Sequence, residues 1–137
     1  IPAAFAKAFY IANSGRPGPV LVDITKNAQF EEMEFEYKRR PVIRSYHPKP
    51  KPTQESLQAA AELINNAQRP MILAGHGIQI AHAQEVFKAF VEKAGIPLAC
   101  TIHGLSTIPN DHPLHMGMLG MHGNYGPNML QNQCDVL

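Results

Sequence analysis

Two glycines that flank a histidine, Gly75-His76-Gly77, are the first candidates for ligand binding. The apolar run Met71 to Ala74 before them suits a strand buried on both faces, and a helical pattern starts near residue 83. A strand, a glycine turn and a helix in this order can present backbone N–H groups to a phosphate. Residue 80 is Ile, so the third glycine of a dinucleotide fingerprint is absent, which argues against an NAD site. A turn that contacts another ligand and a purely structural turn both stay open.

A second candidate is the segment from Met116 to Gly123, which combines methionines with glycines at Gly117, Gly120 and Gly123. Methionine side chains are flexible and polarizable, which suits contact with a flat aromatic ligand or with another subunit. Glycines let the backbone come close to such a ligand. The alternative is a methionine-rich loop of the core.

Histidine and cysteine spacings also raise the question of zinc. The pairs Cys100-x-x-His103 and His112-x-x-His115, with His122 beyond them, resemble zinc-ligand pairs. However, Cys100 ends an apolar segment and is expected to point into the core, and His112 and His115 flank a proline. We therefore expect no metal site.

Lys26 stands just after the apolar segment Val20–Ile24, at the end of a predicted strand where open α/β sheets place their ligands. The alternative is an ordinary surface lysine. Complete catalytic motifs are missing, because the sequence has neither a Gly-Asp pair, which begins the metal-diphosphate motif, nor a G-x-S-x-G elbow. A non-catalytic nucleotide-binding module is therefore one interpretation.

Composition limits the class of protein. The 137 residues are 45% apolar with a net charge of +1, which favours one globular domain or slightly more and argues against nucleic-acid or membrane binding. No apolar run has the roughly 18–20 residues that a membrane span needs. The two cysteines, Cys100 and Cys134, make no disulfide framework, so we expect a reducing, cytoplasmic setting.

The periodicity of apolar residues predicts the elements that hold these candidates. We expect helices over 2–13, 54–67, 83–94 and 127–133, strands over 20–24, 71–74 and 96–101, a further strand from Asp135, and a long loop over 102–122. In the helix over 83–94 the residues expected to be buried are Val86, Phe87, Phe90, Val91 and Ala94.

A strand, a helix and a strand in this rhythm predict parallel pairing, and hence an α/β fold with a parallel sheet and flanking helices. The proline-rich segment 31–52 reads as an inter-domain linker. Its basic run Lys38–Arg40 is either an anion-binding patch or part of that solvated linker. We expect a piece of a longer protein, truncated at both ends.

Two stretches together resemble one family. AFYIANSGRPGPVLVDITKN is similar to the end of the pyrimidine-binding domain of the acetohydroxyacid (acetolactate) synthases, thiamine-diphosphate enzymes. RPMILAGHGI and GIPLACTIHGLSTIPNDHPLHMGMLGMHGN resemble the Rossmann-like central domain of those enzymes. The resemblance implies residues 1–30 as the end of the pyrimidine-binding domain and 53–137 as an incomplete central domain that contacts FAD.

The resemblance also implies site residues. Lys26 matches a lysine near the substrate channel, and no catalytic residue carries over. The positions that match FAD contacts of the family are Arg16, Gly75, His76, Gly77, Thr101, Ile102, His103, Leu119, Gly120, Met121 and His122. His76 stands where the family has a small residue, and His103 where it has glutamine.

The activity that the resemblance implies is the joining of two 2-keto acids, pyruvate with pyruvate or 2-ketobutyrate, with loss of CO₂, in branched-chain amino acid synthesis. The family uses thiamine diphosphate and Mg²⁺, which bind outside this stretch, and FAD. We expect a homo-oligomer, a dimer or a tetramer, with a small regulatory subunit as a further partner. The isolated stretch is expected to be inactive. Another thiamine-diphosphate carboligase or decarboxylase is the alternative enzyme.

Overall fold

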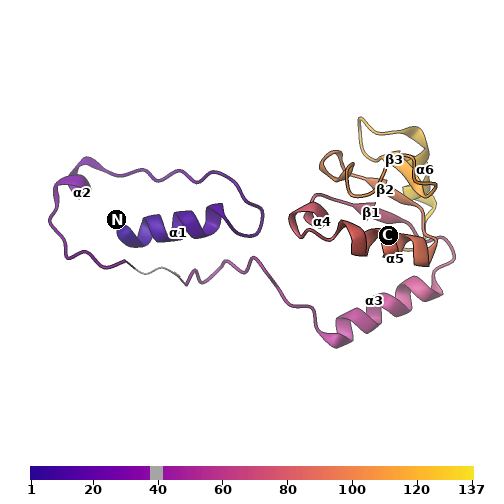
Figure 1. Ribbon diagram of the computed structural model, residues 1–137, viewed down its shortest axis with the longest axis horizontal. Helices are drawn as coiled ribbons and strands as arrows, with labels where there is room; N and C mark the ends of the chain where they lie inside the picture. Colours follow the sequence, from indigo (N-terminus) through magenta and orange to yellow (C-terminus); the bar gives the residue numbers. More distant parts are fainter. Residues whose placement is uncertain (38–41) are drawn as a thin grey trace. The chain divides into compact units, whose positions relative to one another are not determined.

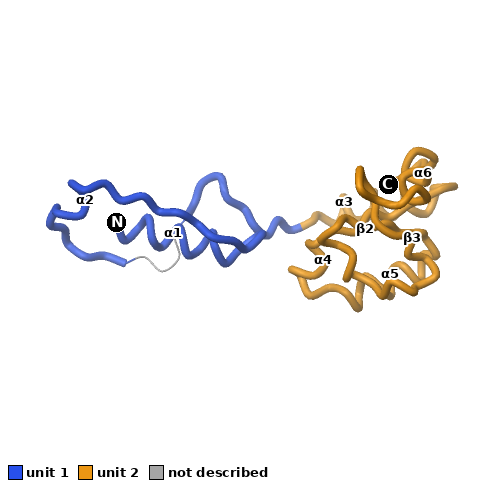
Figure 2. The backbone as a smooth tube through the Cα atoms, turned by 90° about the horizontal axis from the view of Figure 1, so that it is seen from above, with its two compact units in different colours: residues 1–51 blue, residues 52–137 orange. Residues whose placement is uncertain are grey.

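The computed structural model describes residues 1–37 and 42–137 and divides into two compact units, residues 1–51 and residues 52–137 (Figure 2). The basic run Lys38–Arg40, for which an anion patch was one interpretation, lies outside the described residues. The assignment of 1–30, 31–52 and 53–137 to separate parts of a larger enzyme stays a prediction.

The first unit contains the helices α1 (Pro2–Ala12) and α2 (Lys26–Phe30). The prediction of the first helix is confirmed, and Pro2 sits in its first turn, where its missing N–H is tolerated. The predicted strand over Val20–Ile24 is wrong, because no strand forms there and Leu21 is 90% exposed. A strand needs a neighbour to accept its backbone hydrogen bonds, and the described part of this unit offers none.

Tyr46 holds the turn that follows α1. Its hydroxyl donates a 2.9 Å hydrogen bond to the carbonyl of Ser14 and lies 3.0 Å from the Ser14 hydroxyl. Its ring meets Tyr10 edge-to-face with centroids 5.8 Å apart. The next residue, Gly15, has φ +61°, and a Cβ there would lie 2.9 Å from the Tyr46 hydroxyl oxygen, so glycine is required. The turn that carries Arg16 is thus supported by a residue far along the chain.

The second unit is built on a three-stranded parallel sheet in the order β1-β2-β3 (Figure 1). Its strands are β1 (Ile72–Ala74), β2 (Leu98–Cys100) and β3 (His115–Met118). The predicted strands over 71–74 and 96–101 are confirmed as β1 and β2, and so is their parallel pairing. The expectation of a loop over 102–122 is wrong in part, because β3 lies within it. The half-buried sequence of β3, His-Met-Gly-Met, carries none of the branched apolar residues that mark a strand.

The helices of this unit are α3 (Gln54–Asn66), α4 (Gly77–Ile80), α5 (Gln84–Ala94) and α6 (Tyr125–Gln133), with a short 3-10 turn, η1 (Ile102–Gly104). The Thr53 hydroxyl caps α3 by accepting from the backbone N–H of Ser56, and Gly95 ends α5 with φ +64°. Among the described residues, no helix is long and apolar enough to cross a membrane.

The core of this unit lies where α5 meets the strands. Its buried residues are Ala74, Val91, Leu98, Cys100 and Ile108. Of the five residues of α5 that were expected to be buried, Val91 is buried and Phe87 packs against the core. Val86 and Ala94 are exposed, and Phe90 is 41% exposed, so the expectation was wrong for these three. The helix α5 buries a narrow stripe formed by Phe87 and Val91, which are four residues apart. Its remaining apolar residues lie on another face.

Asp135 links the segment after α6 to the segment before β1. Its carboxylate accepts hydrogen bonds from the backbone N–H groups of Gln68, at 2.7 Å, and of Arg69, at 2.9 Å. The next residue, Val136, forms a parallel bridge with Pro70, and its carbonyl accepts from the N–H of Met71 at 2.9 Å. The predicted strand that begins at Asp135 is therefore present as this bridge, beside the free edge of β1.

Substitution of Tyr46 by Phe is expected to loosen the turn after α1. The change keeps the ring contact with Tyr10 and removes the hydrogen bond to Ser14, a loss of about 1 kcal/mol. Amide hydrogen exchange at Gly18, whose N–H donates to the carbonyl of Ala12, should become several-fold faster. Tyr125→Phe, at an exposed tyrosine, is the control. Unchanged exchange at Gly18 in Tyr46→Phe would contradict this role.

Substitution of Asp135 by Asn is expected to lower the stability of the second unit. It is also expected to make that stability fall less when the pH is lowered. The backbone N–H of Gln68, followed by that of Arg69, lowers the pKa of Asp135 below its ordinary value. The stabilisation is therefore present above the unfolded pKa and is lost as the pH falls through the folded pKa. Denaturant unfolding at neutral and acid pH should show a less stable variant with a smaller acid loss. Asp111→Asn should behave as the unsubstituted protein.

Candidate functional site

Parallel pairing gathers the candidate residues at one edge of the sheet. The segments that follow β1, β2 and β3 are Gly75–Gly77, Thr101–His103 and Leu119–His122. The N–H of Thr101 donates to the carbonyl of Ala74 at 2.9 Å, and the N–H of Leu119 donates to the carbonyl of Cys100 at 3.0 Å. Each predicted segment thus starts beside the end of its neighbouring strand, at the carboxyl edge where open α/β sheets bind ligands.

His76 joins the first two segments. Its Nδ1 lies 3.1 Å from the carbonyl oxygen of His103 and 2.5 Å from Oε1 of Gln79. The rings of His76 and His103 are tilted by 54° with centroids 5.9 Å apart. The side chain at this position is therefore held toward the segment after β2 and by its own helix. The helix that follows the glycine turn directly is the single turn α4, ahead of α5, which was expected to come next.

Gly104 sets how closely the ends of β1 and β2 approach. A Cβ at this buried position would lie 2.4 Å from the carbonyl oxygen of Ala74 and 3.0 Å from the Cα of Gly75. No side chain fits there without moving the backbone of the Gly75 turn. The carbonyl of Gly104 accepts from the Thr107 hydroxyl at 2.8 Å, which fixes η1 on its other side. The sequence did not reveal this close packing, because a single glycine after a strand has many structural causes.

The third segment, Leu119–His122, is an exposed loop. Gly120 has φ +115°, a conformation that favours glycine, and the side chain of Met121 is 94% exposed. Asn124 and Asn128 from the start of α6 hydrogen-bond to the backbone at Met118 and at Gly120. Sequence reasoning missed both asparagines. The signal that could have found them is a pair of asparagines four residues apart beside a glycine-rich loop.

The edge leaves room for an extended ligand. A Cβ at Gly77 or at Gly120 would meet no atom within 4 Å, so the backbone at these residues borders open space. Ile102 is 67% exposed and supplies apolar surface together with Met121. Backbone that is open to close approach, beside exposed apolar side chains, suits a planar ring system with a polar tail.

Cys100 is part of the core. Its Sγ lies 3.4 Å from Nε2 of His115 and 3.7 Å from the Thr107 hydroxyl oxygen. Burial raises the pKa of the Cys100 thiol, so it stays protonated at neutral pH. His112 faces elsewhere, with its Nε2 3.6 Å from a carboxylate oxygen of Glu92. Within residues 1–37 and 42–137, no group of three or more histidines, cysteines or carboxylates could hold a metal ion.

Arg16 and Lys26 belong to the first unit. Arg16 follows Gly15 in the turn that Tyr46 supports, and Lys26 is the first residue of α2. Both side chains are exposed.

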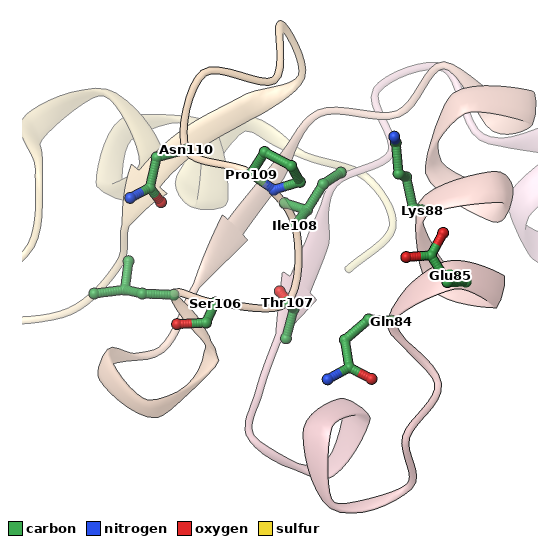
Figure 3. Close-up of a pocket in the computed structure, with 9 residues that line it drawn as sticks. Gln84, Glu85, Lys88, Ser106, Thr107, Ile108, Pro109 and Asn110 are labelled. Carbon is green, nitrogen blue, oxygen red and sulfur yellow. The ribbon is translucent and has the colours of Figure 1, made fainter.

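A separate hollow of about 450 Å³ lies between the first turns of α5 and the loop 105–110. Figure 3 shows Gln84, Glu85 and Lys88 of α5 on one side and the segment Ser106–Asn110 on the other. Lys88 lies 3.9 Å from Glu92, with its side chain 41% exposed. The charged side chains that line the hollow, Glu85 and Lys88, reach solvent.

Comparisons with known proteins match this architecture. Residues 57–137 match the family model described as "Thiamine pyrophosphate enzyme, central domain". The whole chain is 44% identical to the acetolactate synthase large subunit of Corynebacterium glutamicum and 38% identical to that of Lactococcus lactis. It covers 22% and 24% of these relatives, so the chain spans about a quarter of their length.

A solved structure gives the same answer. An X-ray structure from Mycobacterium smegmatis, described as that of a thiamin diphosphate-dependent enzyme, matches 88% of this chain and 23% of its own at 31% identity, with a TM-score of 0.63. The predicted fold class and the resemblance to the acetolactate synthases are thereby confirmed.

Replacement of Gly104 by Ala is expected to push the ends of β1 and β2 apart. The new Cβ would collide with the Ala74 carbonyl, and such overpacking costs about 2 kcal/mol. The free energy of unfolding, from denaturant titration, should fall by this amount. Gly126→Ala is the matched control, because a Cβ there meets nothing within 4 Å and alanine suits the helix α6. Equal stability of the two variants would contradict the close approach.

Proposed function

The chain belongs to the thiamine pyrophosphate enzymes, through their central domain, and from this we propose that it is part of an acetolactate synthase large subunit. The parent protein would join pyruvate to pyruvate or to 2-ketobutyrate with loss of CO₂. The proposal is supported by relatives of that name that match the chain over its whole length. Thiamine diphosphate with Mg²⁺, when bound to the parent protein, supplies the chemistry that releases CO₂.

The role proposed for this chain is to bind FAD at the carboxyl edge of the sheet. The observation that carries it is the meeting of the strand-end segments Gly75–Gly77, Thr101–His103 and Leu119–His122 at one edge. The open backbone of Gly77 and Gly120 and the exposed side chains of Ile102 and Met121 fit a flavin dinucleotide. The resemblance gives FAD no redox part in the main reaction, so its proposed role is to order this edge.

His76 and His103 are accommodated in this proposal by their mutual contact. Because Nδ1 of His76 lies within 3.1 Å of the His103 carbonyl and 2.5 Å of Oε1 of Gln79, its ring is held along the segment after β2. The backbone of Gly75 and Gly77 is then the part of the turn proposed to approach the ligand. The neighbouring His103 ring would contact FAD from the second strand.

The remaining assignments follow from the resemblance. Arg16 is proposed to contact FAD, and Lys26 to lie near the substrate channel. Residues 1–30 would end the pyrimidine-binding domain, 31–52 would be the linker, and 53–137 would be central domain. The parent protein is proposed to be a cytoplasmic homo-oligomer of large subunits that can work with a small regulatory subunit.

The full-length parent protein, supplied with thiamine diphosphate, Mg²⁺ and FAD, is expected to form acetolactate from pyruvate. Colorimetric detection of acetolactate measures this. The isolated 137 residues should form none, because the residues that the resemblance assigns to the thiamine site lie outside them. Turnover of glyoxylate without turnover of pyruvate would replace the proposal by a different carboligase. Absence of any carboligase activity in a protein that still binds FAD would favour a binding module.

A further inference from the structure

We propose that Asn128 is a positioning residue that sets the shape of the loop Leu119–His122, and through it the affinity of this edge for FAD. The second half of this inference rests on the proposed function. Asn128 lies in the first turns of α6, and its amide group faces the backbone of Gly120.

The side-chain amide of Asn128 forms hydrogen bonds with both the N–H and the carbonyl of Gly120. Its Oδ1 accepts from the N–H of Gly120 at 3.0 Å, and its Nδ2 donates to the carbonyl of Gly120 at 3.0 Å. Nδ2 also donates to the carbonyl of Asn124, at 3.0 Å. Both N–H bonds of the side-chain amide are therefore used, and its oxygen is used as well. No other side chain of this size and polarity offers one acceptor beside two donors.

The loop needs such a support because packing gives it little. Gly120 has φ +115°, and Met121 is 94% exposed. Asn124 fixes the base of the loop, since its Oδ1 accepts from the N–H of Met118 at 2.9 Å and its own N–H donates to the Met118 carbonyl at 2.8 Å. Asn128 fixes the tip. The two asparagines at the start of α6 thus hold the loop in place. Such support keeps a binding loop in one conformation before the ligand binds.

The test is Asn128→Asp in the full-length protein. Aspartate has the same shape, but both of its oxygens are acceptors, so one of them would face the carbonyls of Gly120 and Asn124. The loop loses two hydrogen bonds, and repulsion from the two carbonyl oxygens is expected to push the carboxylate away from Gly120, so that the Gly120 N–H loses its acceptor as well. Because the volume of the side chain is unchanged, an empty space in the packing cannot explain the result.

Asn132→Asp is the matched control. It makes the same change of charge in the same helix at an exposed position near the C-terminal end. The helix dipole favours a negative charge near the N-terminal end and disfavours it near the C-terminal end. The dipole alone therefore predicts that Asn132→Asp is the more harmful change. The proposal predicts the opposite order for the loop.

Two measurements separate the steps. Amide hydrogen exchange at Gly120 in the flavin-free protein reports the hydrogen bonding of the loop. Quenching of flavin fluorescence gives the dissociation constant of FAD, and the visible absorption spectrum reports the flavin environment. We expect Asn128→Asp to speed exchange at Gly120 and to raise the dissociation constant, each by roughly tenfold, as loss of hydrogen bonds of ordinary strength implies. Asn132→Asp should stay within about twofold of the unsubstituted protein.

The outcomes are distinguishable. Unchanged exchange at Gly120 in Asn128→Asp overturns the positioning role. Faster exchange with an unchanged dissociation constant and spectrum overturns the link to FAD. If the unsubstituted protein binds no FAD, the proposed function fails, and exchange at Gly120 still decides the role of Asn128. Should Asn128→Asp fail to fold, Asn128→Ala removes all three hydrogen bonds of the side-chain amide, including the one from the Gly120 N–H, adds no charge, and should change both readouts in the same direction.

Discussion

Parallel backbone pairing of β1 with β2, and of β2 with β3, is the interaction on which the second unit depends. Strands that run in the same direction need a crossover between them, and here α4 and α5 supply the crossover from β1 to β2. The same pairing forces the segments after the strands to one edge. Apolar residues of α5 and β2, such as Val91 and Leu98, hold the layers together. The candidate site is therefore a consequence of strand direction.

Parts of this arrangement can be predicted from short stretches of the sequence. An uninterrupted apolar run such as Ile96–Cys100 can be stable only in the interior, so β2 was predictable. The end of α5 was predictable as well, because Gly95 adopts the left-handed conformation that ends a helix. The edge strand β3 was not, because its residues are half-buried and mixed in polarity, and its pairing depends on the strand beside it.

The site was predictable only as far as its residues follow strands. The glycine turn after β1 and the loop after β3 could be placed in this way, together with their neighbour after β2. The supports of these segments could not. Gly104 matters because of the distance to Ala74, and Asn128 because of the direction of the Gly120 peptide. Both depend on the folded backbone. For Val20–Ile24 the sequence predicted a strand that does not form, since the strand-like composition has no partner in the described part of its unit.

The carboxylate of Asp135 has a consequence for the order in which this edge of the sheet can form. It accepts from the backbone N–H groups of Gln68 and Arg69, which lie 67 and 66 residues earlier in the chain. Contacts between residues so far apart in sequence form late, because closing a long loop costs entropy before the contact stabilises anything. The bridge between Pro70 and Val136 is therefore expected to form after the shorter crossover from β1 to β2.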